Sequence, residues 1–82
     1  MTEPLRILLL EDDPVDAELT ERALRKAGLS FTVLRVMERD AFVDALDRFG
    51  PSIVLADYHL PRFDGAQALR MVRRRLAVLA IV

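Results

Sequence analysis

Short apolar runs alternate with amphipathic segments along this chain. Four runs are rich in aliphatic and aromatic residues, and we expect them to be strands: residues 5–10, 31–36, 52–56 and 77–82. Between them, apolar residues recur at the three- and four-residue spacing of helices that bury one face. The second run alternates its side chains, which favours an edge position. Strands that alternate with helices form a parallel sheet with right-handed crossovers, so the pattern predicts a three-layer α/β sandwich.

Capping residues and glycines indicate where the helices begin and end. Asp13 before Pro14 is typical of a helix N-terminus, and we expect this helix to end at Gly28. A second helix is expected from Asp40 to the Gly50-Pro51 pair, and a third after Gly65. The predicted apolar stripes of the three helices are, in turn, Val15, Leu19, Ala23, Leu24 and Ala27; Phe42, Ala45, Leu46 and Phe49; and Ala68, Leu69, Val72 and Leu76.

Composition narrows the functional classes. The 82 residues are enough for one small domain, and 52% hydrophobic with 30% charged residues fits a soluble globular protein. The net charge of −1 gives no field that would gather nucleic acid or anionic lipid. The apolar runs are too short to span a bilayer, and the absence of cysteine suits a reducing compartment. We therefore expect a cytoplasmic protein without nucleic-acid or membrane partners.

Carboxylates follow two of the expected strands. Glu11, Asp12 and Asp13 come after the first strand, and Asp57 comes directly after the third. Ligand sites in parallel sheets lie beyond the carboxyl ends of the strands, so these acids should converge. Carboxylates held close together either raise their pKa values or bind a hard cation through oxygen. The pattern predicts a Mg²⁺ site, with Asp13 interpreted as a helix cap rather than a ligand.

Four short motifs together resemble the receiver domain of two-component response regulators. They are Glu11-Asp12-Asp13-Pro14, Asp57, Leu60-Pro61 and Asp64-Gly65, and the resemblance runs from about residue 6 to residue 65. It implies a flavodoxin-like fold and a function in signalling. In that family an acid at the end of the third strand accepts a phosphoryl group from a histidine kinase or a phosphotransfer protein.

The resemblance also implies roles for individual residues. Asp57 corresponds to the phosphoryl acceptor and Asp12 to a direct magnesium ligand, while Glu11 would reach the ion through water. Asp57 itself and the backbone carbonyl of His59 would complete the protein ligands; the His59 imidazole is interpreted as a solvated side chain. A magnesium site beside the acceptor is chemically consistent, because a carboxylate that attacks phosphorus needs a dication to neutralise the converging negative charges.

Complete receivers continue beyond the fourth strand with a hydroxyl residue, a lysine and further elements. We therefore expect residues 1–82 to form a single receiver-like domain in an incomplete (β/α)3β form that lacks the last helix-strand-helix portion. Without the hydroxyl group and the lysine, the self-phosphorylation chemistry should be impaired, and no other enzymatic activity is expected. An uncovered fourth strand should pair with a second copy, which predicts a homodimer through this region.

Two alternatives remain at this point. The chain could be a phosphorylation-incompetent fragment that acts in interaction or assembly. A magnesium-dependent phosphohydrolase is disfavoured, because it would need a second acid two residues after Asp57, where His59 stands. The basic run of Arg70, Arg73, Arg74 and Arg75 is interpreted as a solvated helix face rather than a docking patch.

Overall fold

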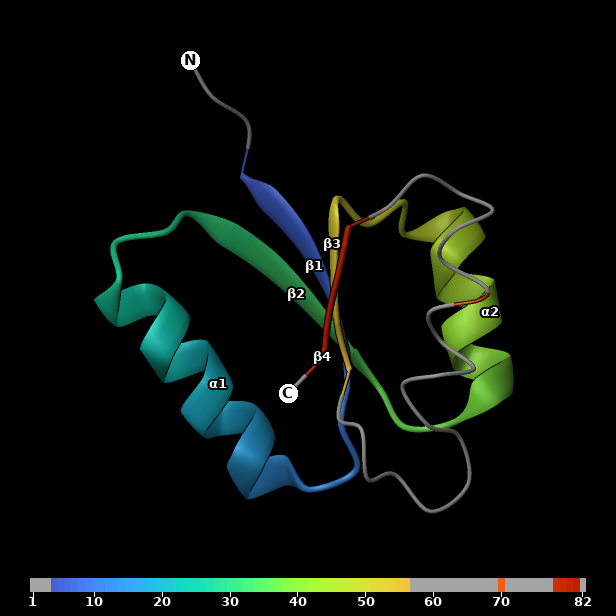
Figure 1. Cartoon of the computed structure of the whole chain (residues 1–82), viewed down its shortest axis with the longest axis horizontal. Helices are drawn as coiled ribbons and strands as arrows, with labels where there is room; N and C mark the ends of the chain where they lie inside the picture. The colour runs from blue at the N-terminus through green and yellow to red at the C-terminus, as the bar shows by residue number, and fades with distance from the viewer. Residues whose placement is uncertain (1–3, 57–69, 71–77, 82) are drawn as a thin grey trace.

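Four parallel strands form one sheet at the centre of the molecule (Figure 1). The structure is a computed structural model that describes residues 4–56, 70 and 78–81. The strands are β1 (Leu5–Leu10), β2 (Phe31–Val36), β3 (Ile53–Ala56) and β4 (Val78–Ile81), in the order β2-β1-β3-β4. The predicted parallel sheet is confirmed, and β2 lies at its edge as expected.

The face of the sheet toward α2 (Arg39–Arg48) carries the main core. In-register pairing places Leu10 between Val36 of β2 and Ala56 of β3, so these three side chains share one face. Phe42 of α2 is fully buried against them. The remaining buried members of this core are Leu8, Ala45, Leu46 and Val54, with Phe49 packed beside them. This confirms the apolar stripe predicted for the second helix.

The second helix begins one residue earlier than predicted, and the third strand one residue later. Glu38 occupies the N-cap position of α2. The chain turns after this helix at Gly50, whose φ of +63° is readily adopted only by glycine. Ser52 does not belong to β3; its amide and hydroxyl donate to the carbonyl of Arg6, and its hydroxyl oxygen accepts from the Arg6 amide. These hydrogen bonds do not belong to the strand pairing, which begins at Ile53 opposite Ile7, so β3 begins at Ile53.

Helix α1 (Pro14–Lys26) covers the opposite face of the sheet (Figure 1). The apolar stripe predicted for it is wrong: Val15 and Leu19 are 62% and 55% exposed, whereas Ala17 is buried and Leu24 half-buried. With 3.6 residues per turn, Ala17 and Leu24 lie two turns apart on one face, while Val15 lies on the opposite side of the helix. Ala23 and Ala27, the other two residues of the predicted stripe, are exposed as well.

Several expectations fall on residues that the structure does not describe. The third helix, with its predicted inward stripe, lies outside the described residues, as do the arginines at 73–75. Arg70 is described; it is helical and exposed. The fourth strand is observed as β4, within the predicted range of 77–82. In the part of the chain that the structure covers, neither helix has the length and apolarity needed to cross a membrane.

Candidate functional site

Strands β1 and β3 end next to each other. Leu10 of β1 pairs with Ala56 of β3, and both strands run in the same direction. The chain therefore leaves β1 at Glu11 beside the point where β3 ends. Asp57 follows Ala56 in the sequence; both Asp57 and His59 lie outside the described residues. The structure thus brings Glu11 and Asp12 to the carboxyl end of the strand that precedes the predicted acceptor.

Glu11 and Asp12 have opposite environments although they are neighbours. Glu11 is 8% exposed and is the one buried charged residue in the described parts of the chain, whereas Asp12 is exposed. A buried carboxylate is costly unless hydrogen-bond donors or cations compensate its charge. The amide of Asp13 provides one such donor, at 3.3 Å from Oε2 of Glu11. The main chain of Glu11 is also held, because its amide donates to the carbonyl of Val36 at 3.0 Å.

Asp13 is a helix cap, as predicted. Its Oδ1 accepts a hydrogen bond of 2.8 Å from the amide of Val15, and its carbonyl accepts the first helical bond from Ala17. Capping of this kind satisfies an amide that would otherwise lack a partner at the start of α1. The carboxylate of Asp13 therefore has a structural function.

Arg35 belongs to the site and was missed by reasoning from sequence. From the end of β2 its Nε donates to the carbonyl of Glu11 at 2.9 Å, and its Nη2 donates to the carbonyl of Asp12 at 3.2 Å. One feature of the sequence could have drawn attention to it: Arg35 is a charged residue within a run that is expected to be a strand. In the structure it pairs with the buried Leu9 of β1. The sequence feature alone could not identify the partners of Arg35, which lie 23 and 24 residues earlier in the chain.

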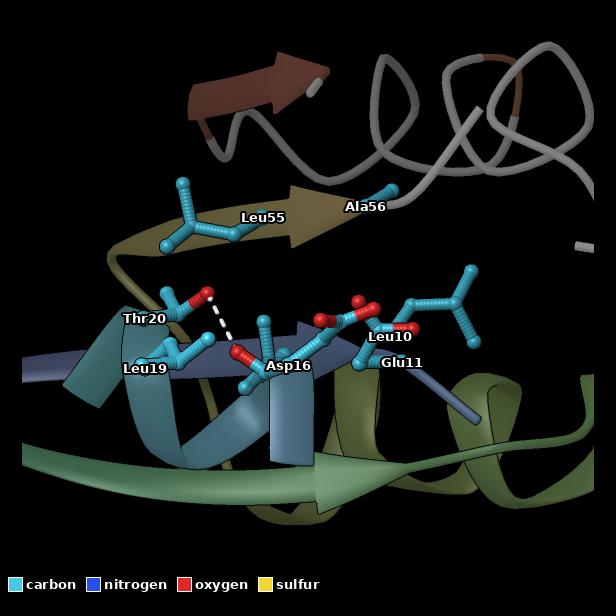
Figure 2. A pocket seen from close by; sticks show the side chains of 8 residues that line it. Leu10, Glu11, Asp16, Leu19, Thr20, Leu55 and Ala56 are labelled. Atoms are coloured by element: carbon cyan, nitrogen blue, oxygen red, sulfur yellow. Dashed lines mark hydrogen bonds between the residues drawn. The ribbon is translucent and has the colours of Figure 1, made fainter. Parts of the chain in front are cut away.

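A groove of about 290 Å³ lies beside Glu11, between α1 and the ends of β1 and β3 (Figure 2). Its aliphatic part comes from Leu9 and Leu55, and its polar part from Glu11 and from Asp16 and Thr20 of α1. The hydroxyl of Thr20 donates to the carbonyl of Asp16 at 3.0 Å. Leu10, Leu19 and Ala56 complete the lining. The buried carboxylate therefore borders a space that is open to small polar species.

The donors at this edge fit a hard divalent cation. Carboxylate oxygens from Glu11 and Asp12 are the ligand type that Mg²⁺ prefers, and the site offers neither thiolate nor imidazole in its described part. No group of three or more metal-ligating side chains occurs among residues 4–56, 70 and 78–81. The other two predicted ligands, Asp57 and the carbonyl of His59, lie outside these residues.

Comparisons with known proteins agree with this arrangement. The family model described as the response regulator receiver domain matches residues 7–82, which extends beyond the range covered by the motifs. The transcriptional regulatory protein TrcR of Mycobacterium tuberculosis is 33% identical over 70 residues, or 85% of this chain and 26% of that protein. The hybrid signal transduction histidine kinase C of Dictyostelium discoideum is 29% identical over 88% of this chain and 6% of its own length.

A solved structure shows the same fold. The receiver domain of the sensor histidine kinase PA1611 from Pseudomonas aeruginosa PAO1, described with a magnesium ion coordinated in its active site cleft, has a TM-score of 0.77 and 30% identity. The similarity covers 96% of this chain and 66% of that domain, so the present chain spans just under two thirds of it. The family match, the sheet order and the acids at the end of β1 together show that the chain belongs to the response regulator receiver domain family of two-component signalling.

Proposed function

We propose that this receiver domain accepts a phosphoryl group on Asp57 from a histidine kinase or a phosphotransfer protein. The observation that carries the proposal is the pairing of Leu10 with Ala56, because it makes the acidic turn after β1 and the residue before Asp57 neighbours at one edge of the sheet. Carboxylates that converge at such an edge are a functional arrangement in parallel sheets. Family membership supports the same reaction.

The reaction is a displacement at phosphorus. A carboxylate oxygen of Asp57 attacks the phosphorus atom of the donor phosphohistidine, the bond between phosphorus and nitrogen breaks, and the imidazole nitrogen keeps the electron pair and takes up a proton. The product is an aspartyl phosphate. A bound Mg²⁺ would neutralise charge on the attacking and transferred oxygens.

The residues proposed to hold Mg²⁺ are Asp12 directly, Glu11 through water, Asp57, and His59 through its backbone carbonyl. The exposed carboxylate of Asp12 is accessible to an ion from solvent, whereas Glu11 is buried and held by the amide of Asp13. This difference supports unequal roles for the two neighbours. A rigid, partly buried Glu11 would orient a metal-bound water, and Asp12 would provide the charge in contact with the ion.

The proposal is tested with acetyl phosphate and Mg²⁺ by intact-mass measurement. The parent protein should gain one phosphate slowly, because its self-phosphorylation chemistry is expected to be impaired, and Asp57→Asn should gain none. Asp44→Asn, which changes an exposed carboxylate on α2, is the matched control and should be labelled like the parent. A phosphate adduct that persists in Asp57→Asn would refute the acceptor assignment. An unlabelled parent would instead favour the phosphorylation-incompetent interaction fragment.

We further propose that residues 1–82 act as one domain that forms a homodimer through β4. Strand β4 pairs with β3 on one side, and no other strand among the described residues pairs with its second side. An edge strand with free backbone groups can add a strand from another copy.

The net charge of −1 supports a proposed role without nucleic acid, and the cysteine-free composition supports a proposed cytoplasmic location.

A further inference from the structure

Arg35 reaches from β2 across to the acidic turn that follows β1. It pairs in register with Leu9, and the two side chains therefore share the face of the sheet that α1 covers. The Arg35 side chain is half-buried, and its guanidinium donates to the carbonyls of Glu11 at 2.9 Å and Asp12 at 3.2 Å. Its Nη2 also contacts the sulfur of Met37 at 3.2 Å.

The two carbonyls lie between the sheet and the helix. The amide of Glu11 makes the last backbone bond to β2, at the carbonyl of Val36, and the carbonyl of Asp13 accepts the first bond of α1. The carbonyls of Glu11 and Asp12 come after this last bond to β2 and before the first bond of α1. The planar guanidinium supplies donors in a fixed geometry and can hold both oxygens at once, whereas a lysine ammonium is a single point of attachment.

We propose that Arg35 is a positioning residue that holds the main chain of Glu11 and Asp12, so that their carboxylates are preorganised for a divalent cation. The inference rests on the function proposed above and adds a residue to it. The three residues between β1 and α1 would otherwise sample several orientations, and each would move the carboxylate oxygens relative to one another. Outer residues that orient metal ligands act in this way.

The charge of Arg35 alone would change the Mg²⁺ affinity in the opposite direction to the proposed positioning role. A positive guanidinium near a cation site repels the ion, so removing the charge should strengthen Mg²⁺ binding. If Arg35 positions the ligands, removing its hydrogen bonds should weaken binding in spite of the lost repulsion. The sign of the change in Mg²⁺ affinity therefore distinguishes positioning from a simple effect of charge.

The experiment measures Mg²⁺ affinity by NMR titration of backbone amides in the parent, Arg35→Gln and Arg35→Lys. We expect Arg35→Gln to bind Mg²⁺ about tenfold more weakly than the parent. This is the lower end of the loss of metal affinity that follows when a residue that orients metal ligands is removed. Arg35→Lys keeps the charge and the long side chain and should fall between the two. Arg6→Gln is the matched control: it removes the same charge and breaks bonds to another backbone carbonyl, that of Phe49, at the opposite end of β1. It should leave the Mg²⁺ affinity unchanged.

A second readout without metal separates this inference from the proposed function. The Asp13 amide, which donates to Glu11, should exchange its hydrogen faster in both Arg35 variants than in the parent, while the Leu8 amide in the centre of β1 should not. If the parent binds Mg²⁺ and Arg35→Gln binds it equally or more tightly, the positioning role is refuted and the proposed function stands. If the parent shows no Mg²⁺ response, the proposed metal site fails, and unchanged Asp13 exchange would then refute the positioning role as well. Arg35→Lys provides both readouts if Arg35→Gln does not fold.

Discussion

Arg6 and Phe49 are joined by two kinds of interaction across 43 residues of sequence. The guanidinium carbon of Arg6 lies 4.4 Å from the centroid of the Phe49 ring, and its Nε donates to the carbonyl of Phe49 at 2.7 Å. A second guanidinium nitrogen, Nη2, donates to the same carbonyl. Phe49 is the C-cap of α2, where carbonyls lack helical partners and the helix dipole favours a cation. One arginine thus fastens the end of α2 to the beginning of β1.

Arg6→Gln should lower the free energy of unfolding by about 1–3 kcal/mol, because it removes a charged hydrogen bond and the contact with the ring. Urea denaturation measures the change. Arg22→Gln is the control, since it breaks an exposed ion pair with Glu18 that contributes about 0.3–0.5 kcal/mol. If both variants lose the same unfolding free energy, the contacts of Arg6 with Phe49 stabilise the domain no more than an exposed ion pair does.

Asp12→Asn should weaken Mg²⁺ binding by about tenfold or more, because a direct charged ligand should matter at least as much as an outer one. The titration can be followed by NMR or by the fluorescence of Tyr58, the one tyrosine of the chain. Asp13→Asn removes an equal charge one residue away, and asparagine can still cap the helix. An equal loss of Mg²⁺ affinity in the two variants would mean that overall negative charge, not Asp12, binds the ion.

Asp13→Ala should destabilise the domain by about 1 kcal/mol, because the Val15 amide loses the Oδ1 acceptor. Asp13→Asn should change stability by only a small part of this amount. Thermal and urea unfolding of both variants measure the difference. Similar stabilities for the alanine and asparagine variants would contradict the capping role of this side chain.

Phe42→Ala should lower the free energy of unfolding by about 3–5 kcal/mol, because the side chain is fully buried between α2 and the sheet. For a small domain this loss can remove most of the stability. Val15→Ala, at the exposed side of α1, should stay within about 0.5 kcal/mol of the parent. A large loss for Val15→Ala would show that the stripe expected from sequence is buried in solution, for instance by a second copy.

Changing Leu79 and Ile81 of β4 to lysine should dissociate the proposed dimer, because charges on an edge strand oppose pairing with another strand. Sedimentation equilibrium of the parent and the double variant measures the association. Substituting Thr32 and Leu34 of the other edge strand, β2, with lysine is the matched control and should leave the dimer intact. A folded parent that sediments as a monomer would refute the dimer.

Local patterns in the sequence were sufficient to predict the described strands and helices and the position of Glu11 and Asp12 after β1. The apolar run before Glu11 and the run before Asp57 predicted two strands, and the observed β1 and β3 agree with them to within one residue. The cap at Asp13 was also predictable, because it depends on residues within the same turn. Such features are determined by chain neighbours, whose spacing is visible in the sequence.

Only the tertiary structure decided which side of α1 faces the sheet and what surrounds the acids. Periodicity identifies a helix but does not give its rotation, which depends here on how Ala17 packs against the strands and leaves Leu19 largely exposed. Burial of Glu11 beside an exposed Asp12, and the bonds from Arg35 to both of their carbonyls, likewise require the register of β1 and β2. These contacts join residues more than 20 positions apart, and their geometry arises only when the strands have paired.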